Sequence, residues 1–114
     1  MRKIERDMNR AIRAGRNFSN SNTTVQTTTF FNSQDVYCEE SRVFLHGNHI
    51  ATVTKNSIFL FDGGWQSNTT KSRLNALLDE FSYGMRVFQK NWEWFVGYKN
   101  VKEDFVNGME LAID

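Results

Sequence analysis

The sequence predicts a single α+β domain in which helices pack on an antiparallel sheet. Two stretches carry apolar residues at helical spacing, and between and after them lie β-branched and aromatic runs separated by short turns. The length of 114 residues suits one domain with a modest core. The expected order over residues 1–114 is an N-terminal helix, a four-stranded antiparallel meander, a central helix packed on the sheet and a C-terminal hairpin.

Residues 1–16 are expected to form a basic amphipathic helix. Ile4, Met8, Ala11 and Ile12 form a narrow apolar stripe at helical spacing. The opposite arc gathers the cationic residues Arg2, Lys3, Arg6, Arg10 and Arg13. Such an arc suits a phosphate backbone, an acidic protein surface or anionic lipid, and it equally suits an ordinary solvated face whose apolar stripe packs on the sheet.

Residues 23–61 are expected to supply the strands of the meander, after a loop over 16–22. The stretch 23–31 is rich in β-branched residues and largely polar, which favours an edge strand. Gly47 and Asn48 indicate a hairpin turn in the next pair of strands. The consecutive apolar residues at 58–61 are typical of a strand covered on both faces, so a helix is expected to lie on one face.

The stretch 62–81 organises the rest of the chain, because it leads from a strand into the clearest helical pattern, expected over 69–83. Leu74, Leu77, Leu78 and Phe81 share one helix face. The candidate N-caps are Asn68, Thr69 and Thr70, and Gly84 is a candidate C-terminal stop.

The start of this helix is also a candidate anion site. Lys71 and Arg73 lie in the first turn, where the helix dipole favours acidic residues instead. Free N–H groups, the hydroxyls of Thr69 and Thr70 and two cations could hold a phosphate, although the spacing is not that of a Walker A loop. The alternative is a capped and solvated helix start. Trp65, just upstream, is a candidate contact residue or an ordinary core aromatic.

The C-terminal part is expected to form a hairpin over 85–98 and a short strand or tail over 105–112. Asn91 lies at the expected reversal. Alternation places Trp92, Trp94, Val96 and Tyr98 on one face of the second strand and Phe95 on the other.

Charge is concentrated at one end of the chain. Residues 1–16 carry six Arg or Lys against two acids, whereas the remaining 98 residues carry eight basic and eleven acidic side chains, giving a net charge of +1. No run approaches the roughly 18 apolar residues of a membrane span, and the charged N-terminus does not resemble a secretory signal. The single cysteine, Cys38, fits a reducing cytoplasm.

No motif for catalysis, metal binding or cofactor binding emerges. Possible acid–base groups at Asp62, Asp79 and Glu80 lack a spacing that joins them to a nucleophile. His46 and His49 flank the expected turn near Cys38, but no third ligand at usable spacing accompanies them. We therefore expect neither an enzyme nor a metal or cofactor site.

Five segments carry a resemblance to a known group of proteins: MNRAIRAGRNFSNSNTTV at 8–25, VFLHGNHIATV at 43–53, GWQSNTTKSRLNALL at 64–78, VFQKNWEWFV at 87–96 and FVNGM at 105–109. With these segments the chain resembles a family of small accessory proteins of tailed bacteriophages, podovirus-like and infecting marine and cyanobacterial hosts. The resemblance implies a non-structural protein made in the cytoplasm of the infected host cell. It supplies no catalytic residues.

These observations lead to two functional hypotheses. The first is a non-catalytic interaction protein that binds a host or phage protein through its basic helix face, with a homodimer compatible with the sequence. The alternative is a nucleic-acid-binding protein that uses the basic helix and the Lys71/Arg73 helix start on phosphates. Against the alternative, the remainder of the chain is acidic and no known nucleic-acid-binding motif occurs.

Overall fold

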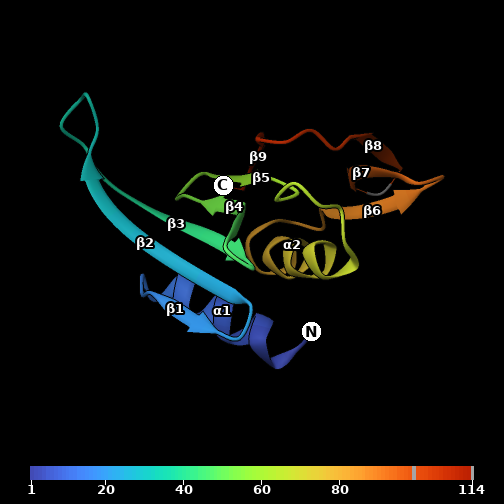
Figure 1. Ribbon diagram of the computed structural model, residues 1–114. Coiled ribbons are helices and arrows are strands. Elements are labelled where there is room, and N and C mark those ends of the chain that lie inside the picture. Colours follow the sequence, from blue (N-terminus) through green and yellow to red (C-terminus); the bar gives the residue numbers. More distant parts are fainter. Residues whose placement is uncertain (99, 114) are drawn as a thin grey trace.

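The computed structural model describes residues 1–98 and 100–113, and that part of the chain folds into two helices and nine strands (Figure 1). The α+β class and the strand meander predicted from the sequence are confirmed. The elements are α1 (Lys3–Arg13), β1 (Phe18–Asn20), β2 (Thr23–Phe31), β3 (Tyr37–Leu45), β4 (Asn48–Val53), β5 (Ser57–Leu60), α2 (Asn68–Phe81), β6 (Arg86–Lys90), β7 (Glu93–Tyr98), β8 (Val101–Asp104) and β9 (Met109–Ala112).

The strands form two antiparallel sheets. The larger sheet has six strands in the order β1-β2-β3-β4-β5-β9, and the smaller has three in the order β6-β7-β8. Consecutive strands pair through short turns, except that β9 returns to the edge of β5 after the excursion through α2 and the small sheet. A register shift between Val43 and Phe44 interrupts the ladder of β3 and β4.

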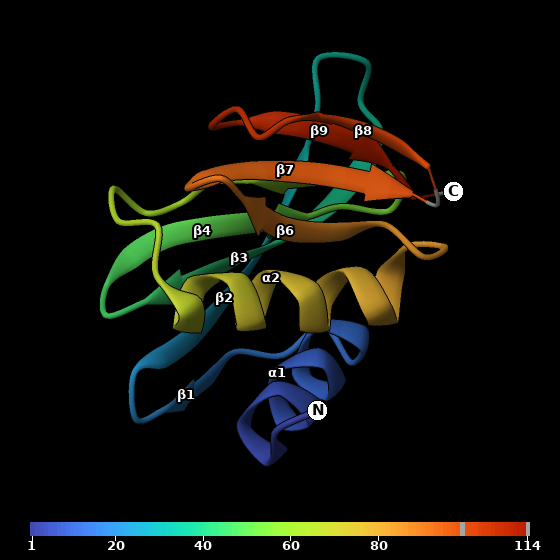
Figure 2. The same cartoon turned by 90° about the vertical axis from the view of Figure 1, so that its right-hand side faces the viewer.

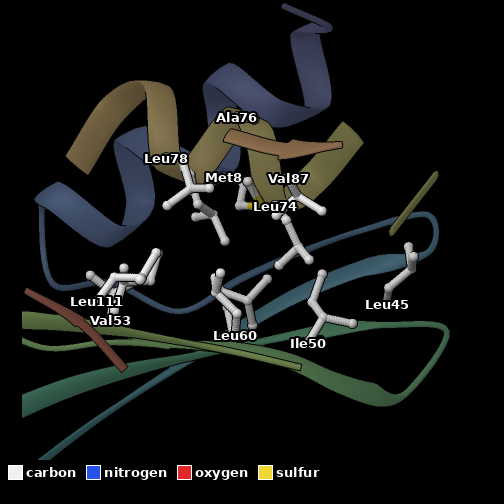
Figure 3. Close-up of a cluster of buried hydrophobic side chains, with 14 of the residues drawn as sticks. Met8, Leu45, Ile50, Val53, Leu60, Leu74, Ala76, Leu78, Val87 and Leu111 are labelled. Carbon is white, nitrogen blue, oxygen red and sulfur yellow. The ribbon is translucent and has the colours of Figure 1, made fainter. Parts of the chain in front are cut away.

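Both helices lie on the same side of the large sheet, with the core between the two layers (Figures 2 and 3). Met8 of α1 and Leu74 and Leu78 of α2 point toward Ile50 and Leu60 of the sheet, and all five side chains are buried. Burying side chains of this size contributes about 1.5–3 kcal/mol each, which accounts for the docking of α1 and α2.

The small sheet closes the same core from another side. Val87 of β6 and Trp94 and Val96 of β7 are buried in the cluster that α2 fills. The open edge of β6 is met by a side chain of α2: Asn75 Nδ2 donates to Val87 O at 2.9 Å, and Asn75 Oδ1 accepts from Val87 N at 2.7 Å. This amide therefore takes the place of a neighbouring strand at Val87.

Strands β2 and β3 continue beyond the body of the molecule as a two-stranded arm (Figure 1). The strands pair through Phe31 and Tyr37 at the tip, whereas β1 pairs with β2 only as far as Val25, and β4 pairs with β3 only as far as Ser41. We call the segment 27–40 the β2–β3 arm. Both of its edges lack a neighbouring strand.

Local turn chemistry differs from the prediction at two hairpins. The β3–β4 turn consists of His46 (φ 51°) and Gly47 (φ 78°), one residue earlier than expected, because Asn48 already pairs with Leu45. The β6–β7 turn contains Asn91 (φ 53°) and also Trp92 (φ 68°), so both are turns with two left-handed residues. The prediction that Trp92 shares the face of Trp94 is therefore wrong.

The ends of α2 also differ from expectation. Ser67, not one of the three following residues, is the N-cap, and its Oγ accepts from Thr70 N at 3.1 Å. The helix ends at Phe81 with an extended Ser82, so Gly84 does not stop it. Gly84 instead adopts φ +88° close to Tyr98, where an added Cβ would lie 2.8 Å from the ring.

Two strands were not expected. β1 forms within the predicted loop 16–22 and has only three residues. β8 consists entirely of exposed residues, so it lacks the apolar alternation that marks a strand in a sequence. β9 takes up the predicted strand or tail over 105–112.

Candidate interaction surface

The first helix buries one side and exposes a basic one. Met8, Ala11 and Ile12 are buried against α2 and β2, with Ile4 half-buried at the margin. The helix ends at Arg13 with Ala14 as its C-cap. Gly15 follows with a left-handed φ of 66°, and Gly15 N donates to Ile12 O while Arg16 N donates to Ala11 O. The five exposed cations Arg2, Lys3, Arg6, Arg10 and Arg13 make up what we call the basic face.

Asp7 is the one acid within this surface, and two of the cations contact it. Lys3 Nζ lies 2.7 Å from Asp7 Oδ2, and Arg10 Nη1 lies 3.8 Å from Asp7 Oδ1. The hydrogen bond from Lys3 is the main reason that the pKa of Asp7 lies below its usual value. In the described part of the chain Arg2 and Arg6 form no ion pair, so the surface keeps an excess of positive charge.

Arg13 has a structural contact that the other cations lack. Its Nε donates to the Glu80 carboxylate, its Nη2 donates to Glu80 O at 2.9 Å, and its guanidinium lies 4.9 Å from the centroid of the Phe81 ring. Arg13 therefore ties the end of α1 to the end of α2. A ligand would have to compete with these contacts to engage it.

A buried ion pair fixes the other end of α1. Glu5 Oε2 accepts from Arg73 Nη1 at 2.9 Å and from Ser72 Oγ at 2.6 Å, and both side chains of the ion pair are only 3% exposed. Arg73 also donates to Thr23 Oγ1 at 3.0 Å and to Asn22 Oδ1 at 3.2 Å. The network joins α1, α2 and the start of β2, and so it sets the orientation of the basic face.

The environment of Glu5 favours its charged form. Burial raises the pKa of Glu5, but the hydrogen bonds from Ser72, from Arg2 N and from Arg73 outweigh it and bring the pKa below its usual value. Glu5 is the one acid of the first turn of α1. Its position on the helix, next to the apolar stripe and outside the basic arc, is the sequence signal that could have identified it.

The start of α2 does not have the geometry expected of an anion site. Arg73 points into the protein and its guanidinium is satisfied by Glu5, Asn22 and Thr23. Thr70 is also buried, and its N–H donates to the Ser67 cap. Thr69 and Lys71 are half-buried. The hypothesis that Arg73 joins Lys71 on a phosphate therefore needs correction, because the burial of Arg73 is explained by the ion pair.

The tryptophans divide between core and surface. Trp94 is 5% exposed and contacts Phe105 edge-on with centroids 5.4 Å apart, whereas Trp65 is 76% and Trp92 is 90% exposed. Trp65 lies in the loop between β5 and α2, and Trp92 lies in the β6–β7 turn. Neither is on α1, so the structure does not bring Trp65 together with the basic face.

Of the two histidines considered as metal ligands, His49 packs inside the fold and His46 lies at the surface. His49 packs between Phe44 and Phe61, with centroids 5.5 and 4.4 Å away, and its Nε2 is 2.7 Å from Thr52 Oγ1. Burial is the main cause that lowers the pKa of His49. His46 lies in the exposed turn. Among residues 1–98 and 100–113 no group of three His, Cys, Asp or Glu side chains could hold a metal ion.

The candidate acids Asp62 and Asp79 also make contacts within the fold. Asp62 accepts from Gly64 N at 2.7 Å within its own loop, and Asp79 pairs with Arg86 at 3.0 Å. Cys38 is half-buried, and its Sγ lies 3.4 Å from Val36 O. Across the described residues, no helix is long and apolar enough to cross a membrane.

With this geometry in place, comparison with known proteins provides an identification. The family model of the Kyanoviridae Gp96 protein matches residues 1–112. The chain belongs to this family. The match confirms the resemblance to a phage accessory family that the five sequence segments indicated. Comparisons with curated proteins and with solved structures found no match.

Proposed function

We propose that this Gp96-family protein is a non-catalytic interaction protein that binds an acidic surface of a host or phage protein through the basic face of α1. The observation that carries the proposal is the combination of a rigidly held helix with an exposed set of five cations that keeps an excess of positive charge. Glu5–Arg73 and Arg13–Glu80 hold the helix, while Arg2 and Arg6 have no ion pair in the part of the chain that is described.

Rigid presentation matters for affinity. A helix that is already docked loses little conformational entropy when a partner binds its outer face. Exposed cations on such a face steer an acidic partner and set its orientation more than they add raw affinity. Arg6 and Arg10 are the residues to test, because Arg6 forms no ion pair in the described part of the chain and Arg10 has only a 3.8 Å contact to Asp7, whereas Arg13 is engaged with Glu80 and Phe81.

The arrangement favours a protein over a single-stranded nucleic acid. Binding of a single strand usually combines a cationic groove with adjacent aromatic side chains on which bases stack. In Figure 2 α1 lies below α2 and the β6–β7 turn, which carries the exposed Trp92, lies above it.

The test is affinity capture from a lysate of infected host cells, with and without nuclease. The wild-type protein is compared with the double variant Arg6→Glu/Arg10→Glu and with the control Lys55→Glu/Lys90→Glu. The control makes the same charge change at exposed residues outside α1 that form no ion pair with the described part of the chain.

A defined protein that is recovered despite nuclease, lost with Arg6→Glu/Arg10→Glu and kept with the control supports the proposal. Recovery that disappears after nuclease treatment assigns the basic face to nucleic acid instead. If the two double variants behave alike, the basic face is a solvated surface and the proposal is wrong.

A further inference from the structure

The edges of the β2–β3 arm differ in chemistry. The open edge of β2 is the uncharged run Thr27-Thr28-Thr29-Phe30-Phe31, whereas the open edge of β3 carries Glu39 and Glu40. Exposed edge strands normally carry charges that prevent pairing with other chains. The edges of β6, β8 and β9 follow this rule, and β1 has only three residues. The β2 edge is the exception.

Hydrogen-bonding groups are available along this edge. Thr27 N donates at 2.8 Å to Asn17 Oδ1, and Asn17 immediately precedes β1, so the N–H of Thr27 points away from β3. N–H groups alternate in direction along a strand, so those of Thr29 and Phe31 point the same way. Neither meets an acceptor in the described part of the chain, and the side chain of Phe31 is 68% exposed.

We propose that two copies of this chain form a two-fold dimer by antiparallel pairing of their β2 edges, centred on Phe30. In this register Thr29 lies opposite Phe31 of the second copy, and each such pair exchanges two backbone hydrogen bonds. The two Phe30 side chains meet across the axis as a non-hydrogen-bonded pair, the kind with the closest side chains. The contact is isologous, so the β2 edge of each copy is paired with that of the other and no further copy can add to it as in a fibre.

The β2 edge is complementary to itself, which makes a second copy of this chain the expected partner. The strand has no charge to repel a second copy of itself. With the two-fold axis at Phe30, the hydrogen-bonded pairs use Thr29 and Phe31, so the bond from Thr27 N to Asn17 is left in place. The same register brings the tip of each arm, which carries Asp35, beside Arg16 of the second copy, because Arg16 O lies 3.3 Å from Thr27 Oγ1. Arg16 forms no ion pair within the described chain.

The interface is small, so the dimer is expected to be weak. Strand pairing over a few residues belongs to the low end of interface sizes, where association is reversible and concentration-dependent. Sedimentation equilibrium from about 1 μM to about 1 mM covers the affinities of such contacts. The wild-type protein is expected to change from monomer to dimer within this range.

Thr29→Pro is the most specific test, because it removes an outward N–H that makes no bond within the described chain. Proline is tolerated on the solvent side of an edge strand, so the arm keeps its pairing with β3. The variant is expected to remain monomeric at every concentration while its circular dichroism is unchanged. The control Thr29→Val keeps the N–H and the strand propensity, and it is expected to dimerise like the wild type.

Disulfide trapping locates the axis independently. Phe30→Cys is combined with Cys38→Ser, because Phe30 pairs with Cys38 within one chain and an internal disulfide would otherwise compete. Residues facing across a two-fold axis have the Cα separation that a disulfide requires. The control Thr28→Cys/Cys38→Ser places the thiols several residues apart, so it is expected to form far less covalent dimer on mild oxidation.

Loss of the dimer with Thr29→Pro, its retention with Thr29→Val and selective trapping through Phe30→Cys together support the proposal. A wild-type protein that stays monomeric throughout the range overturns it, and so does a dimer that survives Thr29→Pro. The dimer does not depend on the basic face, so Arg6→Glu/Arg10→Glu is expected to leave it intact.

Discussion

Glu5 and Arg73 lie 68 positions apart in the sequence, and each side chain is 3% exposed. A buried ion pair of this kind carries a large desolvation penalty, which its hydrogen bonds only offset. Ser72, Thr23 and Asn22 complete the polar contacts, so neither charge is left uncompensated. We therefore expect the pair to fix the docking of α1 more than to add net stability, so removing one partner should be far more damaging than removing both.

We predict that Glu5→Leu and Arg73→Met each reduce the free energy of unfolding by about 3–5 kcal/mol, because each leaves a buried charge without its counter-ion. The double variant Glu5→Leu/Arg73→Met should lose much less than the sum of the two. Urea unfolding of the four proteins measures the coupling directly. Additive losses would show that the pair does not act as a unit.

Acid stability depends on the same carboxylate. The pKa of Glu5 is lower in the folded protein than the value of about 4.3 in an unfolded chain. Between those two pKa values the unfolded state binds more protons, so the stabilisation is complete above about pH 4.3 and is lost as the pH falls through the folded pKa.

We therefore predict that the urea midpoint of the wild-type protein falls on acidification below about pH 5, and that the double variant Glu5→Leu/Arg73→Met loses less over the same range. Asp7, whose pKa is also lowered, contributes in the same direction in both proteins and so cancels in the comparison. Parallel curves for the two proteins would exclude Glu5 as the source of the acid sensitivity.

At the level of elements, the periodicity of apolar residues predicted helices and strands well, but the predicted direction of individual side chains was less reliable. The leucines of α2 predicted a helix, because burial on one face imposes a period. The β-branched and apolar runs of β2 to β5, separated by short turns, predicted the meander. β8 was not predicted, because all of its residues are exposed and no apolar alternation marks it. Trp92 looked equivalent to Trp94, but the left-handed Asn91 and Trp92 place it in the turn.

Arg73 illustrates the corresponding limit for the site. Near the expected start of the helix it looked like a surface cation, and only the packing of α1 across α2 shows that it faces Glu5. The exposed cations of α1 were predictable because they oppose a clear apolar stripe. A long-range polar partner has no such periodic signal.

Asn75 provides a prediction at this scale. Its amide makes two hydrogen bonds to the backbone of Val87, whose side chain is 1% exposed. Asn75→Ala leaves those backbone groups without partners, so we predict a loss of about 1–3 kcal/mol and faster hydrogen exchange of the Val87 amide. Asn68→Ala, at the exposed first residue of α2, should change neither. An unchanged Val87 exchange rate in Asn75→Ala would contradict the role given to the amide.

On the scale of the whole molecule, α2 connects the two sheets into one core. Its Leu74, Leu77 and Leu78 belong to the same buried cluster as Ile58 of the large sheet and Trp94 of the small one. The small sheet has three strands and a minority of the buried residues, so it has little to stabilise it alone. The two sheets should therefore unfold together.

Trp94 allows this cooperativity to be measured. In the variant Trp65→Phe/Trp92→Phe the two exposed tryptophans are removed, and the buried Trp94 becomes the only indole and reports on the small sheet. We predict that its fluorescence and the far-ultraviolet circular dichroism of the helices give the same midpoint in urea, as a two-state transition requires. Because the replaced side chains are exposed, the stability of the variant should stay within about 0.5 kcal/mol of the wild type. A fluorescence change at lower urea than the loss of helix would mean that β6, β7 and β8 open as a separate unit, and that α2 and the large sheet are stable without them.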